Sequence, residues 1–169
     1  MRPRRHVPTD VNAHPHPDAT GRIAVIHNGI IENDRALRTY LERQGVKFRS
    51  ETDTEVLAHL ISKFYEGNLE QAVRKALQEV SGTYGIAVVC ADEPGVVVGA
   101  RRGSPLLIGV GKGEHFLASD PAAVLAHTSQ VVYLKDGEMV RISPRGWEKI
   151  RRGVDKRATG VAILPAAGE

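Results

Sequence analysis

The spacing of hydrophobic and polar residues changes along this chain and divides it into a helical part and a β-rich part. Apolar residues recur at i, i+3 and i+4 over about residues 34–44, 53–64 and 69–81, which is the spacing of amphipathic helices. Gly45 stands where the first helix needs a C-terminal cap, and Thr-Asp-Thr-Glu at 52–55 matches the capping box that opens a helix. The first half of the chain therefore predicts three helices.

Strand-like runs make up most of the remainder. Residues 22–27 form an apolar run that ends at the turn signal Asn28-Gly29, and residues 46–49 form a shorter run. After Gly82 the β-rich runs are separated by Pro, Gly or Asp, and they cover 83–91, 96–101, 106–110, 115–118, 131–134 and 138–142. Between two of them, residues 119–124 predict a short capped helix. Early helices and late strands are typical of an α+β fold with a largely antiparallel sheet.

The charge of the chain is concentrated at its two ends. Residues 6–140 carry 13 basic and 17 acidic side chains, so the net charge of +3 comes from the segments outside them. A nucleic-acid interface normally places basic residues on folded elements near aromatic side chains, so no nucleic-acid partner is expected. No run reaches the roughly 18 apolar residues of a membrane span, and a single cysteine excludes an internal disulfide framework. A cytoplasmic location without membrane contact is expected.

The dipeptide Asn28-Gly29 can be interpreted in two ways. Asn-Gly is the strongest signal for a two-residue hairpin turn, although residues 30–32 lead into a helix rather than a partner strand. A loop at the end of a strand can instead direct an amide side chain and a backbone N–H to one point, which is the composition of an oxyanion hole. Spacing alone favours the turn, and both interpretations stay open.

Asp53 stands at the entrance of the second predicted helix. An acidic side chain there complements the helix dipole and can cap the helix. Alternatively, the carboxylate is held in place to bind a substrate ammonium group. The local pattern favours the structural role, and the binding role stays open.

Other candidate chemistry has weaker support. His14 and His16 lie in a proline-stiffened loop and could join His27 in a hydrolytic metal site, but no Glu-x-x-His or Cys partner has zinc-like spacing. On residue pattern, His27 and His59 are interpreted as structural. Cys90 lies in an apolar strand without a basic neighbour and is interpreted as a packing residue. Neither a metal nor a cofactor is expected.

Several longer blocks follow one another in a characteristic order. They are Asn-Ala-His-Pro-His at 12–16, His-Asn-Gly-Ile-Ile-Glu-Asn at 27–33, Ser-Glu-Thr-Asp-Thr-Glu-Val at 50–56, Arg-Arg-Gly-Ser-Pro-Leu at 101–106, Leu-Ala-Ser-Asp at 117–120 and Val-Tyr-Leu-Lys-Asp-Gly-Glu at 132–138. Together they resemble the glutaminase domain of glutamine–fructose-6-phosphate aminotransferase, also called glucosamine-6-phosphate synthase, a class II glutamine amidotransferase.

The resemblance implies a fold and a mechanism. The fold would be that of the N-terminal-nucleophile hydrolases, a four-layer α-β-β-α arrangement with antiparallel sheets. In the family an N-terminal cysteine attacks the side-chain amide of glutamine, and glutamate and ammonia are released for hexosamine synthesis. The resemblance implies that the Asn28 side chain and the Gly29 N–H hold the oxyanion. It also implies that Asp53 binds the glutamine ammonium group and that His14 lies in a loop closing the pocket.

The chain departs from the family pattern at both ends. It begins Met-Arg-Pro where the family has Cys-Gly-Ile, and residues 3–7 replace the family's Arg-Trp-Ala-Thr-His-Gly block. We therefore expect a truncated or frame-shifted product without the opening strands and the nucleophile, and inactive alone. Its parts would be a divergent start at 1–7, a partial glutaminase domain at 8–147 and a divergent, disordered tail at 148–169.

The expected partners are glutamine and a separate sugar-phosphate isomerase domain or a completing chain. The alternative to a glutaminase fragment is a non-catalytic glutamine-binding or interaction subunit.

Overall fold

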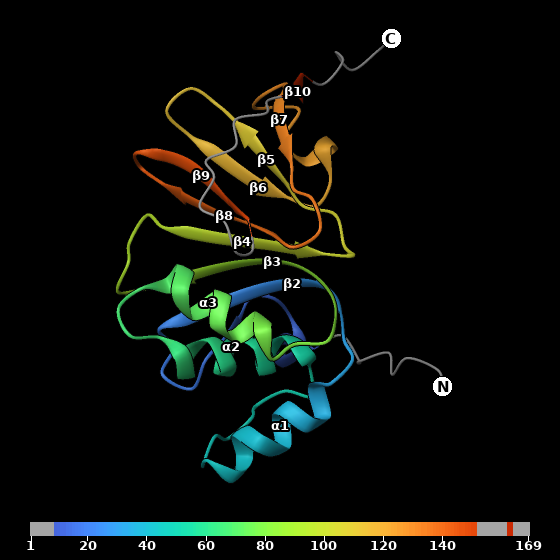
Figure 1. Cartoon of the computed structure of the whole chain (residues 1–169), viewed down its shortest axis with the longest axis vertical. Helices are drawn as coiled ribbons and strands as arrows, with labels where there is room; N and C mark the ends of the chain where they lie inside the picture. The colour runs from blue at the N-terminus through green and yellow to red at the C-terminus, as the bar shows by residue number, and fades with distance from the viewer. Residues whose placement is uncertain (1–8, 152–161, 164–169) are drawn as a thin grey trace.

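The fold consists of two stacked antiparallel sheets with helices on one side (Figure 1). This computed structural model describes residues 9–151 and 162–163. Its helices are η1 (Asp10–Asn12), α1 (Asp34–Arg43), α2 (Asp53–Phe64), α3 (Leu69–Gln78) and η2 (Pro121–Ala123), of which η1 and η2 are 3₁₀ turns. Its strands are β1 (His16–Pro17), β2 (Ile23–Ile31), β3 (Gly82–Cys90), β4 (Val97–Arg102), β5 (Leu107–Val110), β6 (His115–Ala118), β7 (Gln130–Tyr133), β8 (Glu138–Ser143), β9 (Gly146–Arg151) and β10 (Ala162–Ile163).

The order of strands confirms the predicted α+β class. Six strands form one sheet in the order β1-β2-β3-β4-β8-β9, and four form the other in the order β10-β7-β5-β6. Every ladder between these strands is antiparallel. In Figure 1, α2 and α3 lie against β2 and β3, whereas the four-stranded sheet lies at the far side of β4 and β8.

The layers follow from where the apolar side chains are buried. The largest cluster lies between the helices and the six-stranded sheet, and it includes Val25, Leu57 and Ile86, each 0% exposed. A second cluster lies between the two sheets and includes Ile108 and Val140. Burial of each such side chain stabilises the fold by about 1.5–3 kcal/mol relative to exposure.

The outer helical layer of the predicted four-layer arrangement is much reduced. A third, smaller cluster on the four-stranded sheet joins Leu107, Val131 and Val124, the residue that follows η2. Within residues 9–151 and 162–163, η2 is the only helical turn on this side of the molecule. The described residues therefore form three layers and a trace of the fourth.

Local sequence signals explain where the helices begin and end. The Asn68 side chain accepts the N–H of Gln71, so α3 begins at Leu69 as predicted. At the end of α1, the N–H groups of Gly45 and Val46 donate to the carbonyls of Glu42 and Leu41. This is the Schellman pattern, and Gly45 supplies its left-handed residue with φ +86°.

The predicted capping box of α2 forms only in part. The Thr52 hydroxyl accepts the N–H of Glu55, as a capping box requires. The Glu55 carboxylate reaches further back than Thr52 and accepts the N–H groups of Arg49 at 2.8 Å and Ser50 at 2.6 Å. Residues 46–49 are irregular chain, so the strand predicted there was wrong.

The predicted end of the first long strand was also wrong. β2 continues through Asn28 and Gly29 to Ile31, and Gly29 pairs with Tyr84 of β3. Asn28-Gly29 is therefore neither a hairpin turn nor a loop after the strand. Nine pairs with β3 outweigh the local turn preference of the dipeptide.

β9 is a strand that the sequence did not predict. It pairs with β8 from Gly146 to Arg151, so residues 148–151 are part of the sheet, whereas the predicted tail begins at 148. The Lys149 ammonium lies 2.7 Å from the Glu138 carboxylate of β8, with side chains only 8% and 4% exposed. The remainder of the predicted tail lies outside the described residues, except for β10, and so do 1–7.

One part of the six-stranded sheet has an exposed apolar face. Ile26, Ile30 and Val89 are 51%, 60% and 45% exposed. They lie on the face of β2 and β3 opposite the helices, because the residues between them, such as Val25 and Val88, are in the core. Leu117 of β6 packs on Gly99 of β4, so the described part of the second sheet covers β4, whereas Ile26 and Ile30 of β2 stay exposed.

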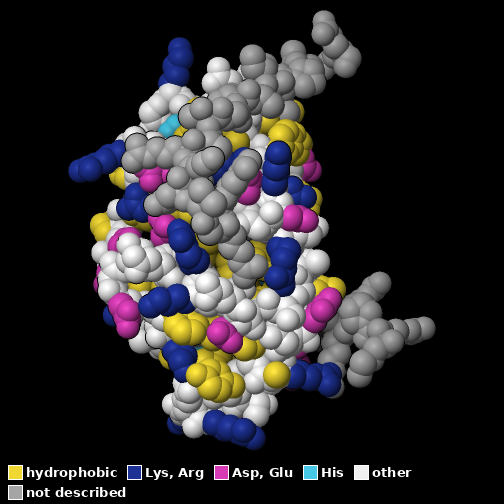
Figure 2. Space-filling model, viewed as in Figure 1, with side chains coloured by type: hydrophobic (Ala, Val, Ile, Leu, Met, Phe, Trp, Pro, Cys, Tyr) yellow, Lys and Arg dark blue, Asp and Glu magenta, His cyan; other side chains and the backbone are white. Residues whose placement is uncertain are grey.

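Basic and acidic side chains are intermixed on the face shown in Figure 2. In the part of the chain that is described, no helix is long and apolar enough to cross a membrane.

Candidate functional site

The free edge of β2 is the structural basis of the candidate site. The even-numbered residues of β2 direct their backbone N–H and C=O groups to β3. Just beyond the two ends of the strand, the Glu32 N–H donates to the Ser81 carbonyl, and the Arg22 carbonyl accepts the Ala91 N–H. Odd-numbered residues therefore direct their N–H groups to the other edge. Among the described strands, β1 covers that edge only at Ala24 and Val25, so no described strand pairs with the edge from His27 onwards.

Asp53 occupies this open edge. Its Oδ2 atom accepts the N–H of Ile31 at 2.9 Å. Because alternate residues of a strand face the same way, the pairing register also directs the Gly29 N–H to this edge, about 7 Å along the strand. The structure thus brings Gly29 and Asp53, which are 24 positions apart in sequence, to one edge of the sheet.

Asp53 is charged and accessible to solvent. Burial alone would raise the pKa of this carboxyl, but the nearby His27 ring, whose Nδ1 atom lies 3.7 Å from Oδ1, and the hydrogen bond from the Ile31 N–H outweigh burial and hold the pKa below its ordinary value. The side chain is 25% exposed and stands in the first turn of α2, where the helix dipole also favours a negative charge. The site therefore presents an accessible carboxylate at neutral pH.

The Asn28 side chain lies on the sheet face opposite His27. It is exposed and shares that face with Ile26 and Ile30. Its amide has no hydrogen-bond partner among residues 9–151 and 162–163. Asn28 is thus adjacent to the open edge, while its amide projects from the bare apolar face.

Gly29 is packed too closely for any other residue. Its φ is +131°, and a Cβ atom built on it would lie 2.3 Å from the Thr83 carbonyl oxygen and 3.0 Å from the Ser104 hydroxyl. These two neighbours were not identified from the sequence, although Ser104 belongs to the block 101–106 that carried the family resemblance. The close approach fixes the backbone at the point where the Gly29 N–H is presented.

His14 lies near Asp53. Burial lowers the pKa of His14, the charges of His16 and His27 lower it further, and only the charge of Asp53 raises it. The result is a pKa below the ordinary value, so His14 is neutral at pH 7. Its ring makes an edge contact with His16 at 5.3 Å between centroids.

The structure groups no metal ligands at this site. Nowhere in the described ranges do three His, Cys, Asp or Glu side chains lie where they could hold a metal ion. The hypothesis of a metal hydrolase with His14, His16 and His27 therefore gains no support from the geometry.

Cys90 is distant from the candidate site. Its side chain is buried, and it pairs with Ile23 at the opposite end of β2 from Gly29. Gly85 pairs with Asn28, and Cys90 lies five positions from Gly85 along β3, which corresponds to about 17 Å. The one cysteine of the sequence is thus not a nucleophile for this site.

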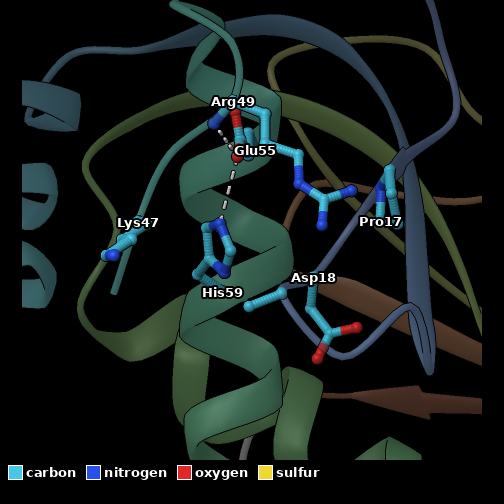
Figure 3. A pocket seen from close by; sticks show the side chains of 7 residues that line it. Pro17, Asp18, Lys47, Arg49, Glu55 and His59 are labelled. Atoms are coloured by element: carbon cyan, nitrogen blue, oxygen red, sulfur yellow. Dashed lines mark hydrogen bonds and ion pairs between the residues drawn. The ribbon is translucent and has the colours of Figure 1, made fainter. Parts of the chain in front are cut away.

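A separate cavity of about 320 Å³ lies beside α2 (Figure 3). Its lining residues are Pro17, Asp18, Ala19, Lys47, Arg49, Glu55 and His59. Both carboxylates in the lining have structural partners. Asp18 accepts the hydroxyls of Thr20 and Ser62, and Glu55 lies 3.2 Å from the His59 ring, as the dashed line shows.

Glu55 gives a prediction for acid stability. Burial alone would raise its pKa, but hydrogen bonds from the Ser50 hydroxyl and the Arg49 and Ser50 N–H groups hold it below the ordinary 4.5. A depressed folded-state pKa stabilises the fold above pH 4.5, and this contribution is lost as the pH falls below that value. Glu55→Gln is expected to lower the free energy of unfolding by about 2 kcal/mol at pH 7.

Urea unfolding measured from pH 7 to pH 3 checks this prediction. The difference between the parent and Glu55→Gln should shrink below pH 4.5. Glu66→Gln, at a side chain 81% exposed, is the control and should have little effect at any pH. A constant difference across the titration would contradict the assignment.

Comparison with known proteins supports the resemblance seen in the sequence. The family described as "Glutamine amidotransferase domain" matches residues 4–126. Glutamine–fructose-6-phosphate aminotransferase (isomerizing) of Symbiobacterium thermophilum is 55% identical over 139 residues, which are 82% of this chain and 23% of that protein. Its namesake in Bordetella pertussis is 46% identical over 170 residues, which are 96% of this chain and 28% of that protein. The chain thus spans about a quarter of the length of these curated relatives.

Solved structures show the same fold. A glutamine phosphoribosylpyrophosphate amidotransferase from B. subtilis, complexed with ADP and GMP, superposes with a TM-score of 0.74 at 28% sequence identity. The match covers 87% of this chain and 33% of that one. The antiparallel two-sheet arrangement described above is therefore shared with these proteins.

Proposed function

Because the chain belongs to the glutamine amidotransferase domain family, we propose that it binds glutamine and stabilises the oxyanion formed when the glutamine side-chain amide is attacked. The observation that carries this proposal is the shared edge of β2. Asp53 accepts the Ile31 N–H there, and the register directs the Gly29 N–H to the same side. A carboxylate and an N–H donor on one edge match the two ends of glutamine.

The charges at this edge suit an amino acid ligand. The α-ammonium group of glutamine would lie against the Asp53 carboxylate, which its hydrogen bonds keep ionised. The side-chain carbonyl oxygen would lie against the Gly29 N–H. That donor is most effective when negative charge develops on the oxygen, as in the tetrahedral intermediate of amide hydrolysis.

Asn28 and His14 have supporting roles in this proposal. The Asn28 amide is adjacent to Gly29 and exposed, so it is available as the second donor to the oxyanion. His14 is held neutral, so it adds no positive charge that would compete with the substrate ammonium for Asp53. Its exposed position near Asp53 suits a residue of a loop that covers the bound ligand.

Among the described residues, no thiol lies at the proposed site. Cys90 is buried about 17 Å from the site, so the residues described bind glutamine and stabilise the oxyanion without supplying the attacking group. In the whole protein we propose hydrolysis of glutamine to glutamate and ammonia for hexosamine synthesis. A sugar-phosphate isomerase domain is the proposed partner, as the name of the relatives indicates. The proposed location is the cytoplasm, consistent with a single, unpaired cysteine.

Calorimetric titration with glutamine tests this function. Asp53→Asn is expected to weaken glutamine binding roughly 10- to 150-fold, because it removes a charge-assisted hydrogen bond of about 1.5–3 kcal/mol. Asp92→Asn is the matched control, since Asp92 is 51% exposed and pairs with Arg22 away from the site. An absence of glutamine binding by the parent chain would refute the proposal.

A further inference from the structure

His27 is a buried imidazole that joins β2, β3 and α2 beside the proposed glutamine site. The residue is 6% exposed. Its Nε2 atom lies 3.3 Å from the Thr83 carbonyl oxygen of β3. Its Nδ1 atom lies 3.2 Å from the Thr54 hydroxyl and 3.7 Å from the Asp53 carboxylate, both in the first turn of α2.

The partners of the ring determine which nitrogen carries the proton. A carbonyl oxygen only accepts, so Nε2 must be the donor to Thr83. Nδ1 lies within hydrogen-bond distance of the Thr54 hydroxyl, which can donate to it or accept from it. This orientation directs Nδ1 to the N-terminus of α2, where Asp53 stands.

The Thr83 carbonyl also determines the backbone at Gly29. It is the oxygen that a Cβ on Gly29 would meet at 2.3 Å. In the register of β2 and β3, the Ile30 N–H would normally donate to this carbonyl. The Ile30 N–H donates to the Thr83 hydroxyl at 3.1 Å, and the His27 ring contacts the Thr83 carbonyl at 3.3 Å. The His27 ring thus contacts the Thr83 carbonyl, which packs against Gly29, and the first turn of α2, which carries Asp53.

We propose that His27 is a positioning residue for glutamine, which holds the Asp53 carboxylate and the Gly29 N–H at a fixed separation through Thr54 and the Thr83 carbonyl. This inference rests on the proposed glutamine binding. The ring itself touches no substrate, because it lies on the buried side of β2.

The test compares two ligands, glutamine and glutaramic acid, which is glutamine without its α-amino group. A well-placed Asp53 discriminates between them, so the parent should bind glutamine at least about tenfold more tightly. His27→Leu should reduce the ratio of the affinities for glutamine and glutaramic acid to near one. His27→Gln keeps an N–H donor for the Thr83 carbonyl and should restore most of the ratio. General loosening of the fold would weaken both ligands alike.

His59→Gln is the matched control, since His59 is another buried histidine bonded to a carboxylate, Glu55, away from Asp53. It should leave the ratio unchanged. If His27→Leu does not fold, Thr54→Val removes the hydroxyl at Nδ1 and should lower the ratio about threefold. A ratio unchanged in Thr54→Val and in the folded His27 variants would overturn the inference. Failure of the parent to bind glutamine would refute the proposed function itself.

Discussion

Replacing Gly29 with alanine is expected to lower the free energy of unfolding by about 4 kcal/mol. A φ of +131° costs an L-residue roughly 1–3 kcal/mol, and forcing a methyl group to within 2.3 Å of the Thr83 carbonyl adds about the same again. The neighbour is backbone of a central strand, so it has little freedom to move. Urea unfolding monitored by circular dichroism measures the difference.

Gly45→Ala separates the two causes. Gly45 also has a positive φ, +86°, but a Cβ atom there would meet no atom within 4 Å. Only backbone strain remains, and the expected cost is about 1 kcal/mol. Equal losses in the two variants would show that the contact with Thr83 does not constrain Gly29.

Replacing Lys149 with methionine is expected to destabilise the fold by about 3–5 kcal/mol. The substitution removes the cation that balances Glu138, and both side chains are buried between β8, β9 and β7. The double variant Glu138→Leu/Lys149→Met removes both charges. It should recover most of the stability, because an apolar pair incurs no desolvation cost for charges.

A surface pair provides the control for Lys149. Lys75 lies 3.5 Å from Glu66, with side chains 48% and 81% exposed. Lys75→Met should change the free energy of unfolding by no more than about 0.5 kcal/mol. A loss of similar size in Lys149→Met would mean that β9 is not held by its ion pair.

Much of the fold was predictable because its signals are local. The Asn68 cap and the apolar period that follows it define α3, and Gly45 ends α1. The β-branched runs after Gly82 correspond to strands within one or two residues. These elements depend on neighbours a few positions apart, which a single sequence displays directly.

The misplaced elements depend on distant partners. The hairpin preference of Asn28-Gly29 is overridden by pairing with β3, which lies more than 50 positions away. β9 was missed because its Lys149 resembles a solvent-exposed residue until Glu138 is placed beside it. Periodicity contains no information about such pairs.

The candidate site was likewise predictable only in part. The family resemblance indicated Asn28, Gly29, Asp53 and His14, and residue pattern alone indicated only a turn and a helix cap. Neither source showed that Asp53 accepts the Ile31 N–H or that His27 bridges β3 and α2. Those relations arise when the strand edge and the helix entrance meet in space.

The bond between Asp53 and Ile31 has a second consequence. An unpaired strand edge beside a bare apolar face is a template on which another copy of the chain can add a strand and begin aggregation. Here the Asp53 carboxylate accepts the hydrogen bond of one N–H group at this edge, the Ile31 N–H, and places a negative charge beside any approaching strand. The carboxylate proposed to bind glutamine is therefore also expected to disfavour the pairing of another strand at this edge.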